Sequence, residues 1–90
     1  MKTINLTTDI RTAAELFKEN SNDSYINLFV QKLLRVLDKK DYNQAMHESI
    51  KAYRELGIEI PDVLTEVYLE KSVTEKKNII YQFIAALKTN

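Results

Sequence analysis

The chain has 90 residues with 13 basic and 13 acidic side chains, which is enough for one small domain. Its zero net charge gives no overall field that would attract nucleic acid or anionic lipid. The sequence has no cysteine, which excludes disulfides, thiolate zinc sites and cysteine nucleophiles. Met1 is followed by no apolar signal region and no stretch of the sequence is long and apolar enough to span a membrane, so we expect a cytoplasmic protein.

The composition also favours helices. One glycine and one proline leave little turn chemistry for a β-sheet, whereas good helix formers are plentiful. We therefore predict an all-α fold in which residues 1–90 form a single domain. Apolar residues at helical spacing indicate a first helix, with one face made by Leu6, Ile10, Ala13, Ala14 and Phe17. Thr7, Thr8 or Asp9 can cap its start, and a short polar loop over 19–24 makes the first two helices antiparallel.

The most apolar stretch, 25–37, predicts a second helix around which the others pack. Its apolar face consists of Ile26, Phe29, Val30, Leu33 and Leu37 and is widened by Tyr25, Leu34 and Val36. A face that covers about half of the circumference is wider than the stripe of a surface helix, so we expect two or three other helices to cover it. Asn22 or Asp23 can cap this helix, and the charged segment 38–41 ends it.

A third helix begins after Asp41, which can cap it, and ends before Gly57, the expected left-handed stop. Its half-polar stripe consists of Tyr42, Ala45, Met46, Ser49, Ile50, Tyr53 and Leu56. The next three residues run extended into Pro61, because a residue before proline avoids the helical region.

Pro61 suits the first turn of a short fourth helix that ends near Lys71. Its buried side is predicted to consist of Ile60, Val63, Leu64, Val67 and Tyr68. Ser72 or Thr74 can cap a last helix, which turns Ile80, Phe83, Ile84 and Leu87 inward, with Ile79 and Tyr81 beside them. The segment 61–88 is either two helices or one bent helix, and the branched and cap-prone residues at 72–74 favour a break there.

The sequence carries no recognisable catalytic set. His47 is the single histidine, and Glu48 cannot orient it, because adjacent helical side chains do not face each other. Carboxylates stand one turn apart at two places, Glu15 with Glu19 and Glu66 with Glu70, without the Glu-x-x-His pattern of di-iron bundles. We therefore predict that the protein is not an enzyme, needs no cofactor or metal and has no small-molecule substrate.

Two stripes are candidate partner-binding surfaces. A basic stripe on the side of the second helix away from its core consists of Lys32, Arg35 and Lys39 together with Leu28. A basic-aromatic flank beside Ile84 on the last helix consists of Lys77, Tyr81 and Lys88. In such stripes the aliphatic parts of the Lys and Arg side chains either cover apolar surface of the protein itself, or the stripe contacts a protein or a membrane-proximal surface. Neither has the charge excess of a nucleic-acid-binding helix, so no nucleic-acid partner is expected.

The order of the elements adds a family resemblance. A capped first helix and a strongly apolar second helix are followed by a third that closes on Leu56-Gly57. An Ile-Pro-led segment with Val63-Leu64-x-x-Val67-Tyr68-Leu69 and a final amphipathic helix complete the chain. This arrangement resembles the immunity proteins of pediocin-like (class IIa) bacteriocins, of the enterocin A immunity type. The printed chain departs from many members in stopping at Asn90, soon after the last helix.

The resemblance implies an antiparallel four-helix bundle with an additional short helix near 61–71. It implies a cytoplasmic protein of a Gram-positive bacterium that protects its producer from a pediocin-like antimicrobial peptide. The implied partner is a membrane receptor, the mannose phosphotransferase permease, with bound bacteriocin. The C-terminal half of such proteins discriminates between bacteriocins, which points here to Lys77, Tyr81 and Lys88.

Two alternatives from other classes stay open. The chain can be a small helical regulatory or adaptor protein, of the antitoxin or phosphotransfer type, in which His47 would be exposed on its helix. It can also be an oligomerising helical scaffold, if the face of the second helix is wider than its partner helices cover.

Overall fold

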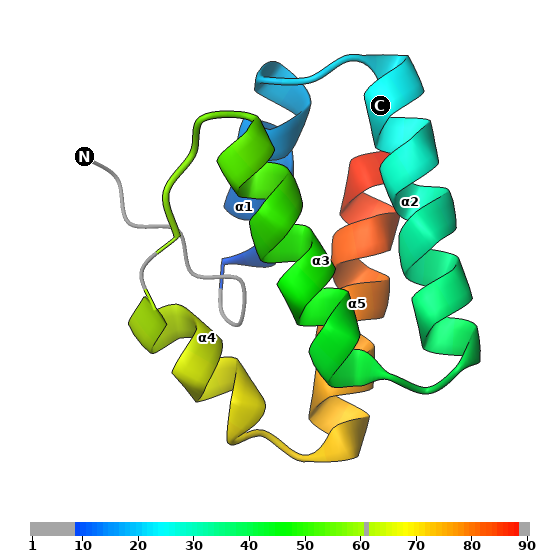
Figure 1. Ribbon diagram of the computed structural model, residues 1–90, viewed down its shortest axis with the longest axis vertical. Coiled ribbons are helices and arrows are strands. Elements are labelled where there is room, and N and C mark those ends of the chain that lie inside the picture. The colour runs from blue at the N-terminus through cyan, green and yellow to red at the C-terminus, as the bar shows by residue number, and fades with distance from the viewer. Residues whose placement is uncertain (1–8, 61, 89–90) are drawn as a thin grey trace.

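The computed structural model describes residues 9–60 and 62–88, and within these ranges every regular element is a helix (Figure 1). The helices are α1 (Ile10–Glu19), α2 (Asp23–Asp38), α3 (Tyr42–Glu55), α4 (Asp62–Leu69) and α5 (Val73–Lys88). The predicted all-α fold is confirmed for this part of the chain. None of the helices found there is long and apolar enough to cross a membrane.

The helices enclose one core, and α5 lies at its centre. It packs against α1, α2 and α3, while α3 also packs against α2 on one side and α4 on another. α2 and α3 run antiparallel and are joined by a short turn, and α4 lies on the opposite side of α3 from α2 (Figure 1). The exposed outer side of α2 and the short α4 are therefore at different ends of the molecule.

Side-chain caps fix where three helices begin. The Asn22 side chain accepts a hydrogen bond from the Tyr25 backbone N–H at 2.8 Å, and Asp41 accepts from the Gln44 N–H at 3.1 Å. Asn22 is therefore the cap of α2 rather than Asp23, and the predicted Asp41 cap is confirmed. Asp9 precedes α1 but makes no side-chain cap bond, and the other two predicted caps, at positions 7 and 8, lie outside the described residues.

Two left-handed residues end α2 and α3. Gly57 has φ of 80°, as predicted, and the N–H groups of Gly57 and Ile58 donate to carbonyl groups in the last turn of α3. Lys40 has φ of 59° in the same position after α2, and its N–H donates to the Leu37 carbonyl at 2.9 Å. Both ends are Schellman-type stops, where glycine is the favoured residue because it has no Cβ. The lysine at this position is not signalled by the apolar pattern.

The segment after Gly57 forms two separate helices, which is the alternative that the residues at 72–74 favoured. The Ser72 hydroxyl accepts from the Glu75 N–H at 3.2 Å, which caps the start of α5, and donates to the Glu75 carboxylate at 3.1 Å. On α4, Tyr68 is buried as predicted, but Val67 is 40% exposed, so that part of the expected buried side is wrong. α4 has eight residues and packs mainly on α3, so only one of its sides is covered. Tyr68 lies on the covered side and Val67 does not. Leu6 and Pro61 lie outside the described residues, and the side chains of Val63 and Leu64 are not described either.

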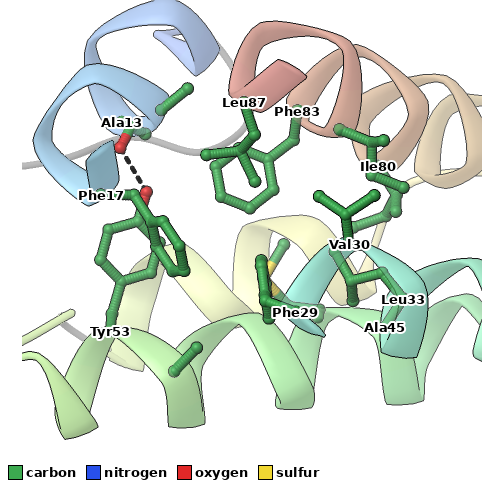
Figure 2. Close-up of a cluster of buried hydrophobic side chains, with 14 of the residues drawn as sticks. Ala13, Phe17, Phe29, Val30, Leu33, Ala45, Tyr53, Ile80, Phe83 and Leu87 are labelled. Carbon is green, nitrogen blue, oxygen red and sulfur yellow. Dashed lines mark hydrogen bonds between the residues drawn. The ribbon is translucent and has the colours of Figure 1, made fainter. Parts of the chain in front are cut away.

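Aromatic rings from four helices meet in the core (Figure 2). The Phe17 ring of α1 lies 4.8 Å from that of Phe29 and 5.2 Å from that of Tyr53, measured between centroids, and Phe83 of α5 closes the cluster. The fully buried Tyr53 hydroxyl donates a hydrogen bond to the backbone carbonyl of Ala13, which ties α3 to α1. Burial raises the pKa of Tyr53, so this donor keeps its proton.

The apolar face of α2 is buried as predicted, and helices α3 and α5 and the Phe17 ring cover it. Two or three helices therefore cover this face as expected, but α2 still lies at the surface, which the width of its apolar face argued against. Leu34, predicted to widen the buried face, is 40% exposed, and Leu28 on the outer side is 66% exposed. On α5, Ile79 is buried and Tyr81 is 45% exposed. The core reaches one side of α2 and leaves its other side to solvent.

Candidate functional site

A groove opens between α2 and α3 on the outer side of the molecule, with a volume of about 170 Å³. Residues of both helices line it, namely Tyr25, Leu28, Phe29, Lys32, Glu48, Lys51, Ala52 and Glu55. Phe29 and Ala52 are buried and form its apolar floor, while Leu28 projects beside it into solvent. We call this hollow the α2–α3 groove. It combines an apolar floor with a charged rim, which is a common arrangement in surfaces that bind a partner.

An ion pair crosses the groove. Lys32 Nζ of α2 lies 2.7 Å from Glu48 Oε2 of α3, and the Gln44 amide donates to the other carboxylate oxygen at 2.8 Å. The Glu48 side chain is only 14% exposed, whereas that of Lys32 is 50% exposed. The hydrogen bond from Lys32 lowers the pKa of Glu48 most, against the opposing effect of burial, and Gln44 and Lys51 lower it further. Glu48 is therefore ionised at neutral pH, and its negative charge balances the positive charge of Lys32 in the ion pair.

A second polar link crosses the groove at the other end of the lining. The Tyr25 hydroxyl of α2 donates to Glu55 Oε2 of α3 at 2.8 Å. Burial, together with the negative Glu55 that accepts this bond, raises the pKa of Tyr25 to about 12. The hydroxyl therefore stays protonated and keeps donating across the physiological pH range. Each link joins the two helices without filling the apolar floor between them.

The six residues predicted as candidate partner-binding surfaces lie in different places in the structure. Lys32 lies in the groove and is ion-paired with Glu48, a contact that the sequence did not predict for the basic stripe. Arg35 and Lys39 follow one and two turns along α2 and are exposed. The basic-aromatic flank lies on α5, where Lys77 and Lys88 are exposed, Tyr81 is half-exposed and the neighbouring Ile84 is buried. The α2–α3 groove contains none of the three flank residues, so the two surfaces are distinct.

Sequence reasoning missed the α3 side of the groove. Glu48, Lys51 and Glu55 follow one another at spacings of three and four, so they share one flank of α3. This spacing indicates a site only once α3 is placed antiparallel beside α2, because the flank of α3 then contacts Lys32 and Tyr25.

The histidine and the paired carboxylates that the sequence analysis considered lie at the surface of the described part of the chain. The side chain of His47 is exposed on α3. The four carboxylates of the pairs Glu15 with Glu19 and Glu66 with Glu70 are exposed as well. Among the described residues, no group of three or more His, Asp or Glu side chains could hold a metal ion.

Comparison with known proteins gives no match to this chain from a protein-family model, a curated protein or a solved structure.

Proposed function

We propose that this protein is an immunity protein against a pediocin-like bacteriocin, acting at the cytoplasmic side of a membrane receptor complex. The order and the boundaries of the helices carry the proposal. The apolar α2, the stop of α3 at Leu56 and Gly57, the short α4 and the amphipathic α5 occupy the segments on which the family resemblance rests. In this proposal α1, α2, α3 and α5 form an antiparallel four-helix bundle, and α4 is the additional short helix.

Protection of this kind requires a stable body that presents a specific surface, and it involves no bond-making step. The core supplies such a body, because the buried aromatic cluster and the Tyr53 hydrogen bond join α1, α3 and α5. The surface that we assign to discrimination between bacteriocins is the basic-aromatic flank, where Tyr81 is 45% exposed between Lys77 and Lys88. Aromatic side chains are enriched in protein interfaces, and a half-exposed tyrosine can bury its ring there while keeping its hydroxyl bonded. The proposed partner is the mannose phosphotransferase permease with bound bacteriocin.

The test is expression of the full chain in a bacteriocin-sensitive strain, followed by challenge with a range of pediocin-like peptides. We expect survival against at least one peptide. A variant carrying Lys77→Gln, Tyr81→Ala and Lys88→Gln should lose that protection at equal protein abundance. A control carrying Arg11→Gln and Lys71→Gln removes the same number of charges away from the flank and should protect fully.

Two results would count against the proposal at different levels. Unchanged killing by every peptide would remove the immunity function itself. Full protection by the flank variant would keep the function but move the contact to another surface. A neighbouring reading frame that encodes a double-glycine leader and a Tyr-Gly-Asn-Gly-Val core would identify the peptide to use first.

The position of His47 favours a second candidate function, a phosphotransfer-type adaptor. His47 is exposed on α3, as a phosphate-accepting histidine must be. Incubation with a phosphodonor should then label the wild-type chain and leave a His47→Ala variant unlabelled. An unlabelled wild-type chain would exclude this candidate for the donor used.

A further inference from the structure

The charges of this neutral molecule are unevenly distributed along its helices. Between positions 59 and 70 there are four acidic side chains and no basic one, namely Glu59, Asp62, Glu66 and Glu70. Between positions 32 and 55 there are six basic side chains, Lys32, Arg35, Lys39, Lys40, Lys51 and Arg54, against four acidic ones, Asp38, Asp41, Glu48 and Glu55. The acidic segment includes α4, which packs on one side of α3, and α2 lies on the opposite side of α3 (Figure 1). The two segments meet where Arg54 of α3 lies 3.9 Å from Asp62 of α4.

Three of the four acids in the basic segment take part in local bonds, and the one ion pair among these bonds cancels one charge of each sign. Glu48 is paired with Lys32, Asp41 caps α3, and Glu55 accepts the Tyr25 hydrogen bond. By contrast, three exposed cations at the end of α2 form no ion pair with any residue of the described chain, namely Arg35, Lys39 and Lys40. Asp38 and Asp41 lie in the same stretch, so this end of α2 carries three basic side chains against two acidic ones, a small excess of positive charge.

An exposed apolar side chain accompanies these cations. Leu28, Lys32, Arg35 and Lys39 recur at spacings of four, three and four, so they share one side of α2. Leu28 is 66% exposed and lies at the α2–α3 groove, whose other rim carries the exposed Lys51. We call the surface formed by Leu28, Arg35, Lys39, Lys40 and Lys51 the basic face.

The backbone at Lys40 adds an independent observation. Its φ of 59° places it in the left-handed region, where a residue with a Cβ is less stable than glycine. A lysine here is therefore unfavourable for the turn, although it adds a cation at the tip of the α2–α3 hairpin. Strained positions of this kind concentrate at functional sites.

We propose that the basic face docks on an anionic phospholipid bilayer. Arg35, Lys39 and Lys40 would lie over the lipid headgroups, with Leu28 at the interface and the acidic α4 turned away from the membrane. Lysine is depleted in protein interfaces, whereas clusters of basic residues with an apolar side chain are typical of surfaces that bind anionic lipid. The uneven charge orients the molecule even though its net charge is zero. This inference goes beyond the immunity function and does not depend on it.

The test is sedimentation of the full chain with vesicles of phosphatidylglycerol and phosphatidylcholine, compared with vesicles of phosphatidylcholine alone. We expect binding to the anionic vesicles only, weakening as salt is added because screening shortens the reach of the charges. A variant with Arg35→Gln, Lys39→Gln and Lys40→Gly should bind about a hundredfold more weakly, roughly fivefold for each charge. Leu28→Ala changes an exposed side chain and should also weaken binding.

A matched control carries Arg11→Gln, Arg54→Gln and Lys71→Gln, which removes three charges from outside both the basic face and the basic-aromatic flank. It should keep most of the binding, and circular dichroism should show that both triple variants are folded. Three results would overturn the proposal: no sedimentation with anionic vesicles, equal sedimentation with phosphatidylcholine alone, or equal loss in both triple variants. An acidic protein as the true occupant would give the first of these results. Because the assay contains neither receptor nor bacteriocin, its failure would leave the immunity proposal standing.

Discussion

Replacing Lys40 by glycine should stabilise the protein, since the backbone there already has the conformation that glycine adopts without steric cost. A residue with a Cβ loses about 1 kcal/mol in the left-handed region. The Lys40→Gly variant also loses a cation near the negative end of the α2 dipole, an effect of roughly 0.3 kcal/mol or more at an exposed site. Lys40→Ala loses the same cation and keeps the strain. The glycine variant should therefore be more stable than the alanine variant by about 1 kcal/mol.

Gly57 provides the reciprocal test in the same protein. It has φ of 80°, and a Cβ added there would meet no atom within 4 Å, so alanine is disfavoured only by the backbone. Gly57→Ala should therefore destabilise the protein by about 1 kcal/mol, which is a fall in Tm of about 4–8 °C for a domain of this size. Urea unfolding followed by far-ultraviolet circular dichroism measures all three variants. The reasoning fails if Lys40→Gly is no more stable than Lys40→Ala.

Four other predictions follow from single contacts. Tyr53→Phe removes the buried hydrogen bond between α3 and α1 and should cost about 1 kcal/mol in urea unfolding, whereas no change would mean that the bond contributes nothing net. Ser72→Ala removes the side-chain cap of α5 and should also cost about 1 kcal/mol, and Ser72→Asp should restore most of it. The pKa of Glu48 is lowered by folding. Its contribution to the free energy of unfolding is therefore present at neutral pH and is lost as the pH falls through that pKa. Glu48→Gln should flatten the acid side of the stability profile. The pKa of Tyr25 is raised by folding, so its contribution to the free energy of unfolding is lost as the pH rises from 10 to about 12. Tyr25→Phe should therefore reduce the loss of stability over that pH range.

The helices, their caps and their buried faces were largely predictable because each depends on residues within one or two turns. Asp41 and Ser72 act through the N–H group three residues later, and Gly57 through the carbonyl groups just before it. The apolar face of α2 follows from periodicity in the same way, and it predicted the buried side correctly. The width of the covered face of α2 depends on how many helices pack against it, and Leu34 lies beyond them and is 40% exposed.

The candidate site was harder to predict because it depends on two helices being placed side by side. The bond from Lys32 to Glu48 joins residues 16 positions apart, and that from Tyr25 to Glu55 joins residues 30 positions apart. No local pattern encodes either contact. Lys40 was missed for another reason, because a left-handed stop is normally signalled by glycine and here the turn forms without it.

The most direct test of the proposed immunity function is the inhibitory concentration of pediocin-like peptides against a sensitive strain that carries, or lacks, this chain. The account predicts that the chain raises the inhibitory concentration of at least one peptide and that the Lys77, Tyr81 and Lys88 variant abolishes the rise. Identical inhibitory concentrations with and without the chain, across the whole peptide range and with the protein present in the cells, would contradict it.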